Sequence, residues 1–351
     1  MSTTKKVLLM ILIGIIYFVF DTMLQAGVFK SVTNNFYGEE LAVYHGVFGP
    51  EDMEWDRDNN QIFISSLDRR SQRAGKPQDT DGIYLIHPNV ENDKPILLKT
   101  SLKGGFHPHG ISLFKLDGKT YLYAINHNKG NNTVELFQFK DNFLDHLETY
   151  KGEEMFSPND VVGDEIGKFY VTNDHGNRTD FWKKIEDYLR MPYSYVLYYD
   201  GAEFSKAHQG MVYANGVQFS NDGSKLYASH TTGHEVFVLD RNIKTGMLIV
   251  KETIKINSGL DNIDVDENDH IWVTGHPKVF DFLAHFTNSS YLSASEIYEI
   301  TLVGKEYKVS KVYENDGSQI SAASVVVAKN DTLFVGCVFD DNIVKLHSEK
   351  P

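Results

Sequence analysis

Residues 215–230 read NGVQFSNDGSKLYASH, and this stretch decides the fold. Apolar and polar residues alternate on both sides of Asp222-Gly223, which is the period of a half-buried β-strand. An Asp-Gly pair between two alternating runs is a strong signal of a tight turn. We therefore predict a β-hairpin over residues 215–230.

The same hairpin pattern recurs along the chain at intervals of roughly fifty residues. A further strand pair follows most copies, such as EVFVLDRN at 235–242 and MLIVKETIKI at 247–256. Four-stranded units repeated at this period are typical of β-propeller blades around a central channel. A β-sandwich would not need one pattern in every unit, so we expect an all-β fold, a six-bladed propeller. The six copies are EDMEWDRDNNQIFISS from Glu51, HGISLFKLDGKTYLYAIN from His109, NDVVGDEIGKFYVTND from Asn159, NGVQFSNDGSKLYASH from Asn215, DNIDVDENDHIWVTGH from Asp261 and AASVVVAKNDTLFVGCV from Ala322.

The N-terminus carries an uninterrupted apolar run, VLLMILIGIIYFVF at 7–20, directly after two lysines. Such a run is typical of a signal peptide or of a short membrane anchor. Residues 24–27 are only a weak cleavage site, so we expect an uncleaved hydrophobic anchor helix within residues 1–28. The propeller domain, residues 29–351, would be extracytoplasmic, either membrane-anchored or, after cleavage, secreted.

A second helix is predicted at residues 180–190, DFWKKIEDYLR, where apolar residues recur at the helical period. We expect it to pack across one end of the propeller. Burial there, gating of a pocket, contact with a membrane and contact with a second subunit are all compatible with its sequence. Its apolar face comprises Phe181, Trp182, Ile185, Tyr188 and Leu189.

The chain has 48 acidic and 34 basic residues, which gives a formal net charge of −14. This charge opposes phosphate binding and argues against a nucleic-acid partner. It suits a divalent cation, although it could also serve solubility alone. Cys337 is the single cysteine, so no intramolecular disulfide can form. Stability must come from the core or from bound metal.

The first two residues of each hairpin carry the information about function. Equivalent positions of successive blades meet around the axis of a propeller, so these pairs should converge. Several carboxylates this close would repel one another unless a cation neutralised them. Five of the six pairs bring a carboxylate, an amide or an imidazole: Glu51-Asp52, His109-Gly110, Asn159-Asp160, Asn215-Gly216 and Asp261-Asn262, but not Ala322-Ala323.

Oxygen ligands without cysteine favour a hard cation, and a mixture of carboxylate and amide oxygens favours Ca²⁺ over Mg²⁺. A single Asn or Asp more often caps a turn, but that interpretation weakens when the residues share one structural position. The residues suffice for two calcium ions. Asp52 and Asp160 would hold one ion, and the other would be bound by Glu51, Asn159, Asn215, Asp261 and Asn262.

Two histidines accompany the predicted metal site. His109 holds the axial position of its blade, and His127 ends the outgoing strand of the same hairpin, whereas His107 belongs to the entering loop. Two neutral imidazoles can act in series, one taking a proton from water and the other relaying it. We therefore predict a catalytic pair, with a structural histidine in the channel as the alternative.

The motifs FHPHGISL, NHNKGNNTVELFQF, SPNDVVG, KFYVTNDH, YANGVQFSNDG and LDNIDVDENDHIWVTGHP, in this order, resemble the paraoxonases. These enzymes are calcium-dependent lactonases and aryl esterases with a six-bladed propeller. The similarity extends from Tyr44 to the C-terminus. The resemblance implies that the larger ligand set holds a catalytic calcium ion and the smaller set a structural one, to which the carbonyl of Ile111 contributes.

The resemblance also implies that His109 and His127 form the catalytic dyad. It implies contact of a membrane or lipid surface with the N-terminal segment and with residues 180–190. The positions that match the wall of the substrate pocket are Asp174, His175, Tyr213 and His276.

Two features depart from the paraoxonase pattern. The animal enzymes join their termini by a disulfide, for which Cys337 has no partner, so closure of the ring should depend on strand pairing. The loop at 67–82, LDRRSQRAGKPQDTDG, lacks the tyrosine of the animal active-site flap, which puts the choice of small-molecule substrate in doubt.

The sequence thus predicts calcium-dependent hydrolysis of lactones and aryl esters, with promiscuity toward phosphotriesters as an extension. Calcium would stabilise the oxyanion while the histidines activate water. No G-x-S-x-G nucleophile motif is present. The alternatives are a non-catalytic, calcium-stabilised binding propeller and a sugar-lactonase or strictosidine-synthase-like member of the wider superfamily.

Overall fold

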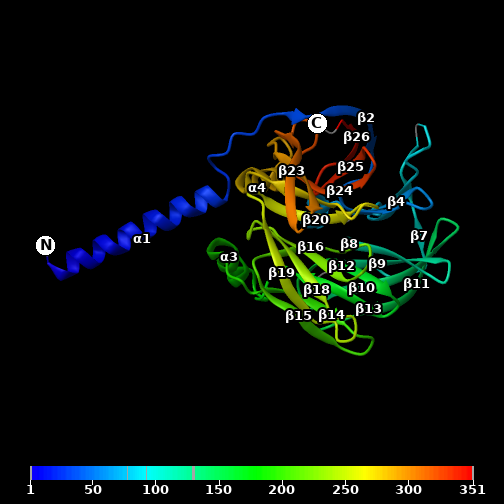
Figure 1. The fold of residues 1–351 in the computed structure, drawn as a ribbon, viewed down its shortest axis with the longest axis horizontal. Coiled ribbons are helices and arrows are strands. Elements are labelled where there is room, and N and C mark those ends of the chain that lie inside the picture. Colours follow the sequence, from blue (N-terminus) through cyan, green and yellow to red (C-terminus); the bar gives the residue numbers. More distant parts are fainter. Residues whose placement is uncertain (1, 77, 92, 129–130, 350–351) are drawn as a thin grey trace.

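The computed structural model describes residues 2–76, 78–91, 93–128 and 131–349, so Lys129 and Gly130 of the NHNKGNNT motif lie outside the described residues. Across these ranges the chain forms six β-sheets arranged around one axis (Figure 1). The prediction of a six-bladed propeller is therefore confirmed.

Each blade is one sheet whose strands run in sequence order from the axis outward, except that the outermost strand of the second, fifth and last blades comes from an earlier part of the chain. The first blade has β3 (Pro50–Asp56), β4 (Gln61–Ser66), β5 (Gly82–Ile86) and β6 (Ile96–Leu97). The second has β8 (Pro108–Leu116), β9 (Lys119–Asn128), β10 (Asn131–Lys140), β11 (Phe143–Tyr150) and, at its edge, β7 (Lys99–Thr100). The third has β12 (Pro158–Glu165), β13 (Lys168–Asn173), β14 (Ser194–Tyr199) and β15 (Phe204–Met211).

Among the remaining blades, the fifth gains a two-residue N-terminal strand at its outer edge, and an eight-residue N-terminal strand is the outer strand of the last. The fourth has β16 (Ala214–Phe219), β17 (Lys225–His230), β18 (Glu235–Arg241) and β19 (Leu248–Lys255). The fifth has β20 (Gly259–Val265), β21 (Ile271–His276), β22 (Ser295–Val303), β23 (Glu306–Asn315) and β1 (Asn35–Phe36). The last has β24 (Ala323–Lys329), β25 (Thr332–Cys337), β26 (Asn342–Ser348) and β2 (Gly38–His45).

Strand pairing closes the ring, as the sequence predicts. β2, from the N-terminal side of the domain, pairs antiparallel with β26, in a register that runs from Gly38 opposite Ser348 to His45 opposite Asn342. Cys337 is buried and free. The last blade is therefore completed by a strand that precedes the first blade in the chain, and apolar side chains pack between these two blades.

The hydrophobic core lies in layers between neighbouring blades. Between the first and last blades, Trp55, Ile62 and Ile64 pack against Val325 and Phe334. These side chains are at most 5% exposed, and burial of each contributes about 1.5–3 kcal/mol. The layers hold the blades at fixed positions, so the ends of their inner strands form a rigid rim.

The inner strands line the channel, and each one carries a β-bulge close to its first residues. The first two residues of each hairpin are called its axial pair below. In a regular strand successive side chains point to opposite faces, so the two residues of an axial pair could not both face the axis. A bulge re-aims side chains locally. It lets both members of pairs such as Glu51-Asp52 and Asn159-Asp160 contribute to one end of the channel, a requirement that the sequence did not reveal.

Three helices follow the second strands of their blades: α2 (Arg69–Arg73) after β4, α3 (Asp180–Leu189) after β13 and α4 (Val279–Thr287) after β21. Each second strand ends where the antiparallel inner strand begins, so these helices lie at the end of the channel that carries the axial pairs. α3 confirms the helix predicted at 180–190. α2 and α4 were missed: α2 has only five residues, too few to show a helical period, whereas α4, with nine residues, is almost as long as α3 and was overlooked.

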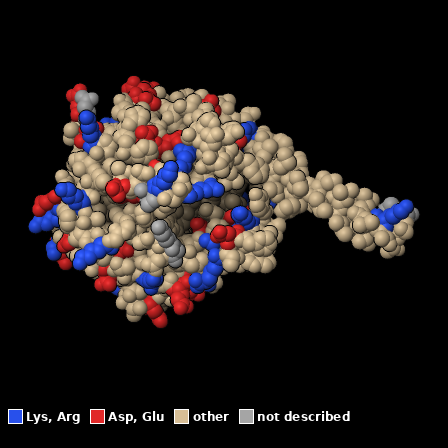
Figure 2. All heavy atoms as spheres, turned by 180° about the vertical axis from the view of Figure 1, so that it is seen from behind, with Lys and Arg blue, Asp and Glu red and all other residues tan. Residues whose placement is uncertain are grey.

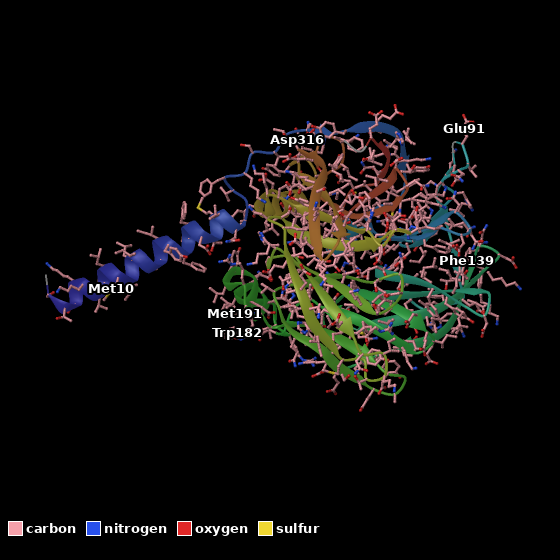
Figure 3. All side chains as sticks on the ribbon, in the orientation of Figure 1. Met10, Glu91, Phe139, Trp182, Met191 and Asp316 are labelled. Atoms are coloured by element: carbon pink, nitrogen blue, oxygen red, sulfur yellow. The ribbon has the colours of Figure 1, made fainter. Side chains whose placement is uncertain are left out.

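The apolar face of α3 is not buried against the propeller, so burial, one of the four predicted roles of this helix, is not what the structure has. Phe181 is 66% and Trp182 55% exposed, and Figure 3 places Trp182 on the outer side of the molecule. The buried residue of the helix is Glu186, whose carboxylate accepts hydrogen bonds from the backbone N–H groups of Gly176 and Asn177. α3 is thus held by its polar side and turns its apolar side to the surroundings.

The N-terminal apolar run forms α1 (Thr3–Gln25), a helix long and apolar enough to cross a membrane. It projects from the propeller (Figure 1), and the face of α1 drawn in Figure 2 shows charged side chains at its N-terminal tip, while Asp21 lies near its other end. Its base is fixed near α3 and α4, because Arg190 forms an ion pair with Asp21 and the N–H of Val279 donates to the Ala26 carbonyl. The exposed sides of α1 and α3 therefore lie in the same part of the molecule.

Candidate active site and metal centre

The larger predicted ligand set gathers at the end of the channel that carries the axial pairs. Its members lie at the starts of the inner strands β3, β12, β16 and β20. Strands β12, β16 and β20 are neighbours in this order, and β24 lies between β20 and β3. The amide nitrogen of Asn262 lies 3.2 Å from Glu51 Oε1 and donates to the Glu51 carbonyl at 2.9 Å. All five side chains are buried: Glu51, Asn159, Asn215, Asp261 and Asn262.

Four oxygen atoms of this set are buried and accept no hydrogen bond from the described residues. Buried oxygens nearly always have a donor, because an unsatisfied one costs about 1–3 kcal/mol. Four such atoms, at the starts of inner strands around one channel, are oxygen ligands of the kind that a hard cation takes. They are Glu51 Oε2, Asn159 Oδ1, Asn215 Oδ1 and Asn262 Oδ1. The residues present therefore fit calcium.

Charge around Glu51 favours its ionised form. Burial alone would raise the pKa of this carboxyl, but the charges of His109 and Arg69 and a hydrogen bond from Asn262 outweigh burial and lower the pKa to about 2. Within the described residues, no three His, Cys, Asp or Glu side chains are gathered to hold a metal ion. The set above draws three of its five side chains from asparagine, so its chemistry is that of a calcium site.

The smaller predicted set also converges. Asp52 accepts hydrogen bonds from the N–H groups of Met53 and Ile111, and Asp160 accepts from Val161 and Val217. The contact seen at Ile111 is made by its N–H group, whereas the prediction concerned its carbonyl oxygen. Burial raises the pKa of both carboxyls, and the nearby charge of Asp160 raises that of Asp52 further. A cation would relieve this repulsion.

Glycine makes the close approach of the blades possible. A Cβ atom on Gly110 would lie 2.4 Å from Asp160 Oδ1, and one on Gly216 would lie 2.6 Å from the Cα atom of Asn262. Both glycines are the second members of their axial pairs, where any side chain would occupy the space of the neighbouring ligand. The glycines at these positions thus serve the site and not the strands.

The two predicted histidines are in direct contact. Nδ1 of His109 lies 2.8 Å from Nε2 of His127, and Nδ1 of His127 lies 2.9 Å from Oδ1 of Asn132. The Asn132 amide nitrogen donates to the Phe156 carbonyl, so its oxygen faces His127 and accepts. His127 then donates from Nδ1 and accepts at Nε2, which makes Nδ1 of His109 the donor. Burial and the neighbouring His109 lower the pKa of His127 to about 4, which keeps it neutral.

When the pair is neutral, the nitrogen of His109 without a proton is Nε2. A protonated His109 would instead donate from this atom to Glu51, and it supplies the charge that lowers the pKa of Glu51. Nε2 lies 3.3 Å from Glu51 Oε2, one of the four buried oxygens. The basic end of the dyad therefore faces the proposed metal site and not the surface.

Of the four predicted pocket residues, Asp174, His175 and Tyr213 form one group, and His276 contacts a member of the larger ligand set. His276 contacts Asp261 through Nε2 at 2.8 Å, and His175 contacts Asp174 through Nδ1. The Tyr213 ring lies 5.1 Å from that of His175, and its backbone has φ +58°, which costs a non-glycine residue about 1 kcal/mol or more. Backbone strain of this kind clusters at functional sites.

Sequence reasoning missed several residues that complete the site. Asp187 of α3 lies 3.0 Å from Nε2 of His175, and Asn132 orients the dyad from β10. Phe282 of α4 packs 4.4 Å from the ring of His276, and Arg69 of α2 approaches Glu51. The signal that could have found the helix residues is their place directly after the second strand of a blade, where connections cross the site.

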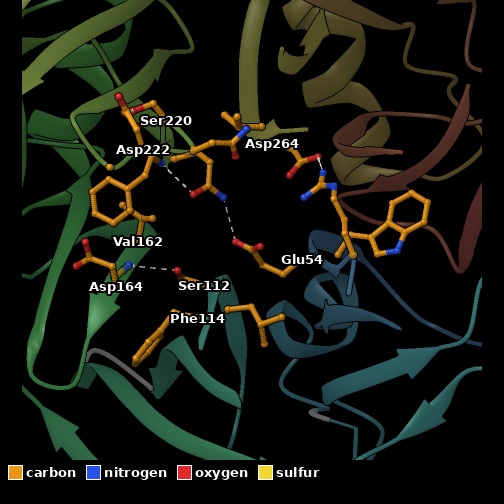
Figure 4. A pocket seen from close by; sticks show the side chains of 17 residues that line it. Glu54, Ser112, Phe114, Val162, Asp164, Ser220, Asp222 and Asp264 are labelled. Carbon is orange, nitrogen blue, oxygen red and sulfur yellow. Dashed lines mark hydrogen bonds and ion pairs between the residues drawn. The ribbon is translucent and has the colours of Figure 1, made fainter. Parts of the chain in front are cut away.

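The opposite end of the channel holds a pocket of about 440 Å³ (Figure 4). It is lined by later residues of the same inner strands and by the loop at 220–223, and several of its polar groups are paired with one another. Arg57 binds Asp264, and the amide nitrogen of Gln218 lies 3.1 Å from Glu54 Oε1. No sequence-predicted site residue lines this pocket within the described part of the chain.

Comparison with known proteins gives a consistent result. The family model described as Arylesterase matches residues 45–344. The chain is 31% identical to rat serum paraoxonase/arylesterase 2 over 301 residues, which covers 83% of this chain and 84% of that protein. It is 32% identical to human serum paraoxonase/arylesterase 1 over 306 residues, with the same coverage. A luciferin-regenerating enzyme of known structure shares the fold, with a TM-score of 0.55 at 12% identity over 90% of this chain and 96% of that one. The chain therefore belongs to the arylesterase family, together with the serum paraoxonases.

Proposed function

We propose that the protein is a calcium-dependent hydrolase of lactones and aryl esters, with weaker activity toward phosphotriesters. The observation that carries the proposal is the set of unpartnered, buried oxygens from Glu51, Asn159, Asn215 and Asn262, which the basic nitrogen of a histidine pair faces. The names of the paraoxonase/arylesterase relatives support the same class of substrate.

In the proposed mechanism, a calcium ion held by these oxygens and by Asp261 would polarise the ester carbonyl and stabilise negative charge on its oxygen. Nε2 of His109 accepts a proton from the attacking water. Its Nδ1 then passes a proton to Nε2 of His127, 2.8 Å away, and Asn132 holds His127 in the tautomer that can accept it. Asp52 and Asp160 would hold the second, structural ion beneath this centre.

The walls of the site position the substrate. Tyr213 and His276 contribute apolar ring surface, while His276 also orients Asp261 through its 2.8 Å contact. Asp174 and His175 form the opposite wall and connect it to α3 through Asp187. A substrate would enter between α2, α3 and α4, because these helices surround this end of the channel.

The N-terminal helix supports a location at a membrane. α1 would anchor the protein, with the propeller on the extracytoplasmic side, and the exposed apolar side chains of α3 would contact the lipid surface. The proposed partners are therefore a lipid surface and a small-molecule substrate.

The test is hydrolysis of aliphatic lactones, aryl acetates and a phosphotriester, before and after EGTA and with calcium added back. We expect lactone and aryl ester turnover that EGTA abolishes and calcium restores. His109→Gln should lower turnover about 10² to 10⁴-fold while calcium content is unchanged. A folded, calcium-loaded protein inert toward the whole panel would instead favour a binding propeller, and turnover restricted to sugar lactones would favour a sugar-lactonase-like member of the superfamily.

A further inference from the structure

Arg69, at the first position of α2, points a charged group at the proposed metal site. Its side chain is 14% exposed, and Nη2 lies 3.5 Å from Glu51 Oε2. Nη1 lies 3.4 Å from the carbonyl of Val338. Nη2 is buried and has no hydrogen-bond partner among the described residues. Because a guanidinium carries five N–H donors, most of the donors of Arg69 have no strong acceptor.

The neighbouring Arg70 has a different role, because its contacts hold α2 in place. Arg70 donates from Nη1 to Asp340 at 2.7 Å and from Nη2 to the carbonyl of His285 at 2.8 Å. Its guanidinium also lies 5.1 Å from the centre of the Phe339 ring. Arg70 thus fastens α2 to α4 and to the last blade. This anchoring holds Arg69 over the channel instead of leaving it in a loose loop.

Arg69 and the catalytic base converge on the same atom. Glu51 Oε2 lies 3.3 Å from Nε2 of His109 and 3.5 Å from Nη2 of Arg69. When Glu51 gives its charge to a metal ion, as the proposed function requires, Arg69 loses the carboxylate that it faces. A buried cation without a partner is strongly unfavourable. The pocket then carries excess positive charge that an anionic ligand would neutralise.

A second basic side chain lies on the α3 side of the site. Lys183 of α3 is half-buried and donates to Ser157 Oγ at 3.0 Å, next to Asp174. Figure 2 shows that the face drawn there is hollowed near its centre, with both basic and acidic side chains around the hollow. Positive charge at individual positions such as Arg69 and Lys183 can attract anions even though the whole chain has a net charge of −14.

We propose that Arg69 binds a carboxylate group of the substrate, so that the preferred substrates are esters and lactones that carry a free carboxylate. The planar guanidinium matches a carboxylate with two parallel hydrogen bonds, which a lysine cannot form. This inference rests on the proposed hydrolase function and assigns Arg69 the role of a specificity-determining residue.

The test compares two aryl esters of matched length, 4-nitrophenyl glutarate monoester and neutral 4-nitrophenyl pentanoate, with calcium-loaded full-length protein. We expect the wild type to favour the anionic ester in kcat/KM. Arg69→Gln should reduce the ratio of the two kcat/KM values about 10- to 100-fold, the loss of a hydrogen bond to a charged group. Arg69→Lys should keep part of the preference, because the charge remains while the fork is lost.

Arg73→Gln is the matched control. Arg73 lies on the same helix but is exposed and stacks on Phe286 with its guanidinium 4.6 Å from the ring centre. This variant should leave the ratio of the two kcat/KM values unchanged. An equal change in Arg69→Gln and Arg73→Gln would mean that the effect comes from α2 as a whole, and would overturn the assignment.

A binding measurement separates this inference from the proposed function. Calorimetry with glutarate should show binding to wild type that weakens about 10- to 100-fold in Arg69→Gln. If neither ester is hydrolysed, the proposed function fails, while glutarate binding that depends on Arg69 would still support carboxylate recognition. If both esters are hydrolysed and Arg69→Gln leaves their ratio and glutarate binding unchanged, the proposed function stands and this inference is wrong.

Discussion

The two ends of the central channel are made by the same six inner strands of the described chain, yet their polar side chains differ in whether they have hydrogen-bond partners. At the end with the axial pairs, buried oxygens of Glu51 and Asn215 have no hydrogen-bond donor among the described residues. At the opposite end, Asp264 is paired with Arg57 and Glu54 with Gln218.

This difference separates a structural polar cluster from a functional one. The propeller repeat places polar residues at both ends, so polarity alone does not locate the site. Where side chains satisfy one another, as Arg57 and Asp264 do, the cluster needs no ligand. Where several oxygens are left open in a buried space, the folded protein is stabilised by whatever supplies the missing positive charge.

The largest effect that follows from this comparison concerns Asp261. Asp261→Ala removes a carboxylate from the proposed calcium site and leaves His276, 2.8 Å away, without its partner. We expect kcat to fall about 10² to 10³-fold, as when one electrostatic contact to the developing charge is lost. The measurement is lactone turnover at saturating calcium, together with the calcium content of the purified variant.

Gln218→Ala at the opposite end is the matched control. It removes the hydrogen bond to Glu54 and should lower the free energy of unfolding by about 1 kcal/mol with little effect on turnover. Full, EGTA-resistant activity in Asp261→Ala, or an equal loss of turnover in both variants, would show that the two ends do not differ in the way described.

A smaller effect is expected from Gly110→Ala, which changes the spacing of two blades without removing a ligand. The added methyl group would lie 2.4 Å from Asp160 Oδ1 and 2.5 Å from its Cα atom, so β12 must shift. We expect the free energy of unfolding to fall by up to about 3 kcal/mol. Urea unfolding with and without calcium should show that the variant also gains less stability from the ion.

Ser112→Ala, farther along the same strand, sharpens this experiment. Ser112 Oγ accepts a hydrogen bond from the N–H of Gly163 at 3.2 Å, so its loss should cost about 1 kcal/mol. The stabilisation by calcium should remain intact in this variant. A similar loss of calcium stabilisation in both variants would show that the ion is sensitive to any change in β8 and not to the contact at Gly110.

The sequence predicted the fold because the hairpin pattern is repeated, and repetition makes a weak signal strong. It also brought Glu51, Asn159, Asn215, Asp261 and Asn262 together, since equivalent blade positions must meet at the axis. It could not reveal the bulges that let neighbouring residues share one end of the channel. Bulges are irregularities of backbone pairing, which alternation of side chains does not record.

The sequence was also silent on the residues that the helices bring to the site. Arg69 and Asp187 lie outside the repeated pattern, so no counterpart in another blade marks them. The sequence correctly predicted that α3 has an apolar face, but not that this face points away from the propeller. Amphipathicity alone does not say which side of a helix packs against the rest of the protein. The buried Glu186 shows that a polar contact, in this case to the N–H groups of Gly176 and Asn177, can decide that orientation.

The smallest predicted effect uses pH to compare the two ends. Asp174 and Asp187 outweigh burial and raise the pKa of His175 to about 10 in the folded protein, against about 6.5 in the unfolded chain. The stabilisation from protonated His175 is therefore complete below pH of about 6.5, declines above it and is lost as pH rises through about 10. His175→Gln should lower the free energy of unfolding by about 1.5 kcal/mol at pH 6 and by almost nothing at a pH of about 10.

Lys115→Gln supplies the contrast at the opposite end, where Lys115 contacts Asp56 and Asp58 at 2.7 Å each. The pKa of Lys115 is raised above its usual value by these carboxylates, although burial opposes this, and the pKa of Asp56 is lowered despite burial. Both groups thus stay charged between pH 6 and 10, and the cost of Lys115→Gln should not change across that interval. Urea unfolding of both variants against wild type, repeated along the pH range, gives the two profiles. A flat profile for His175→Gln would mean that His175 is not held as a cation between α3 and the site wall. The contact between this helix and the active site would then have to come from Glu186 and Lys183.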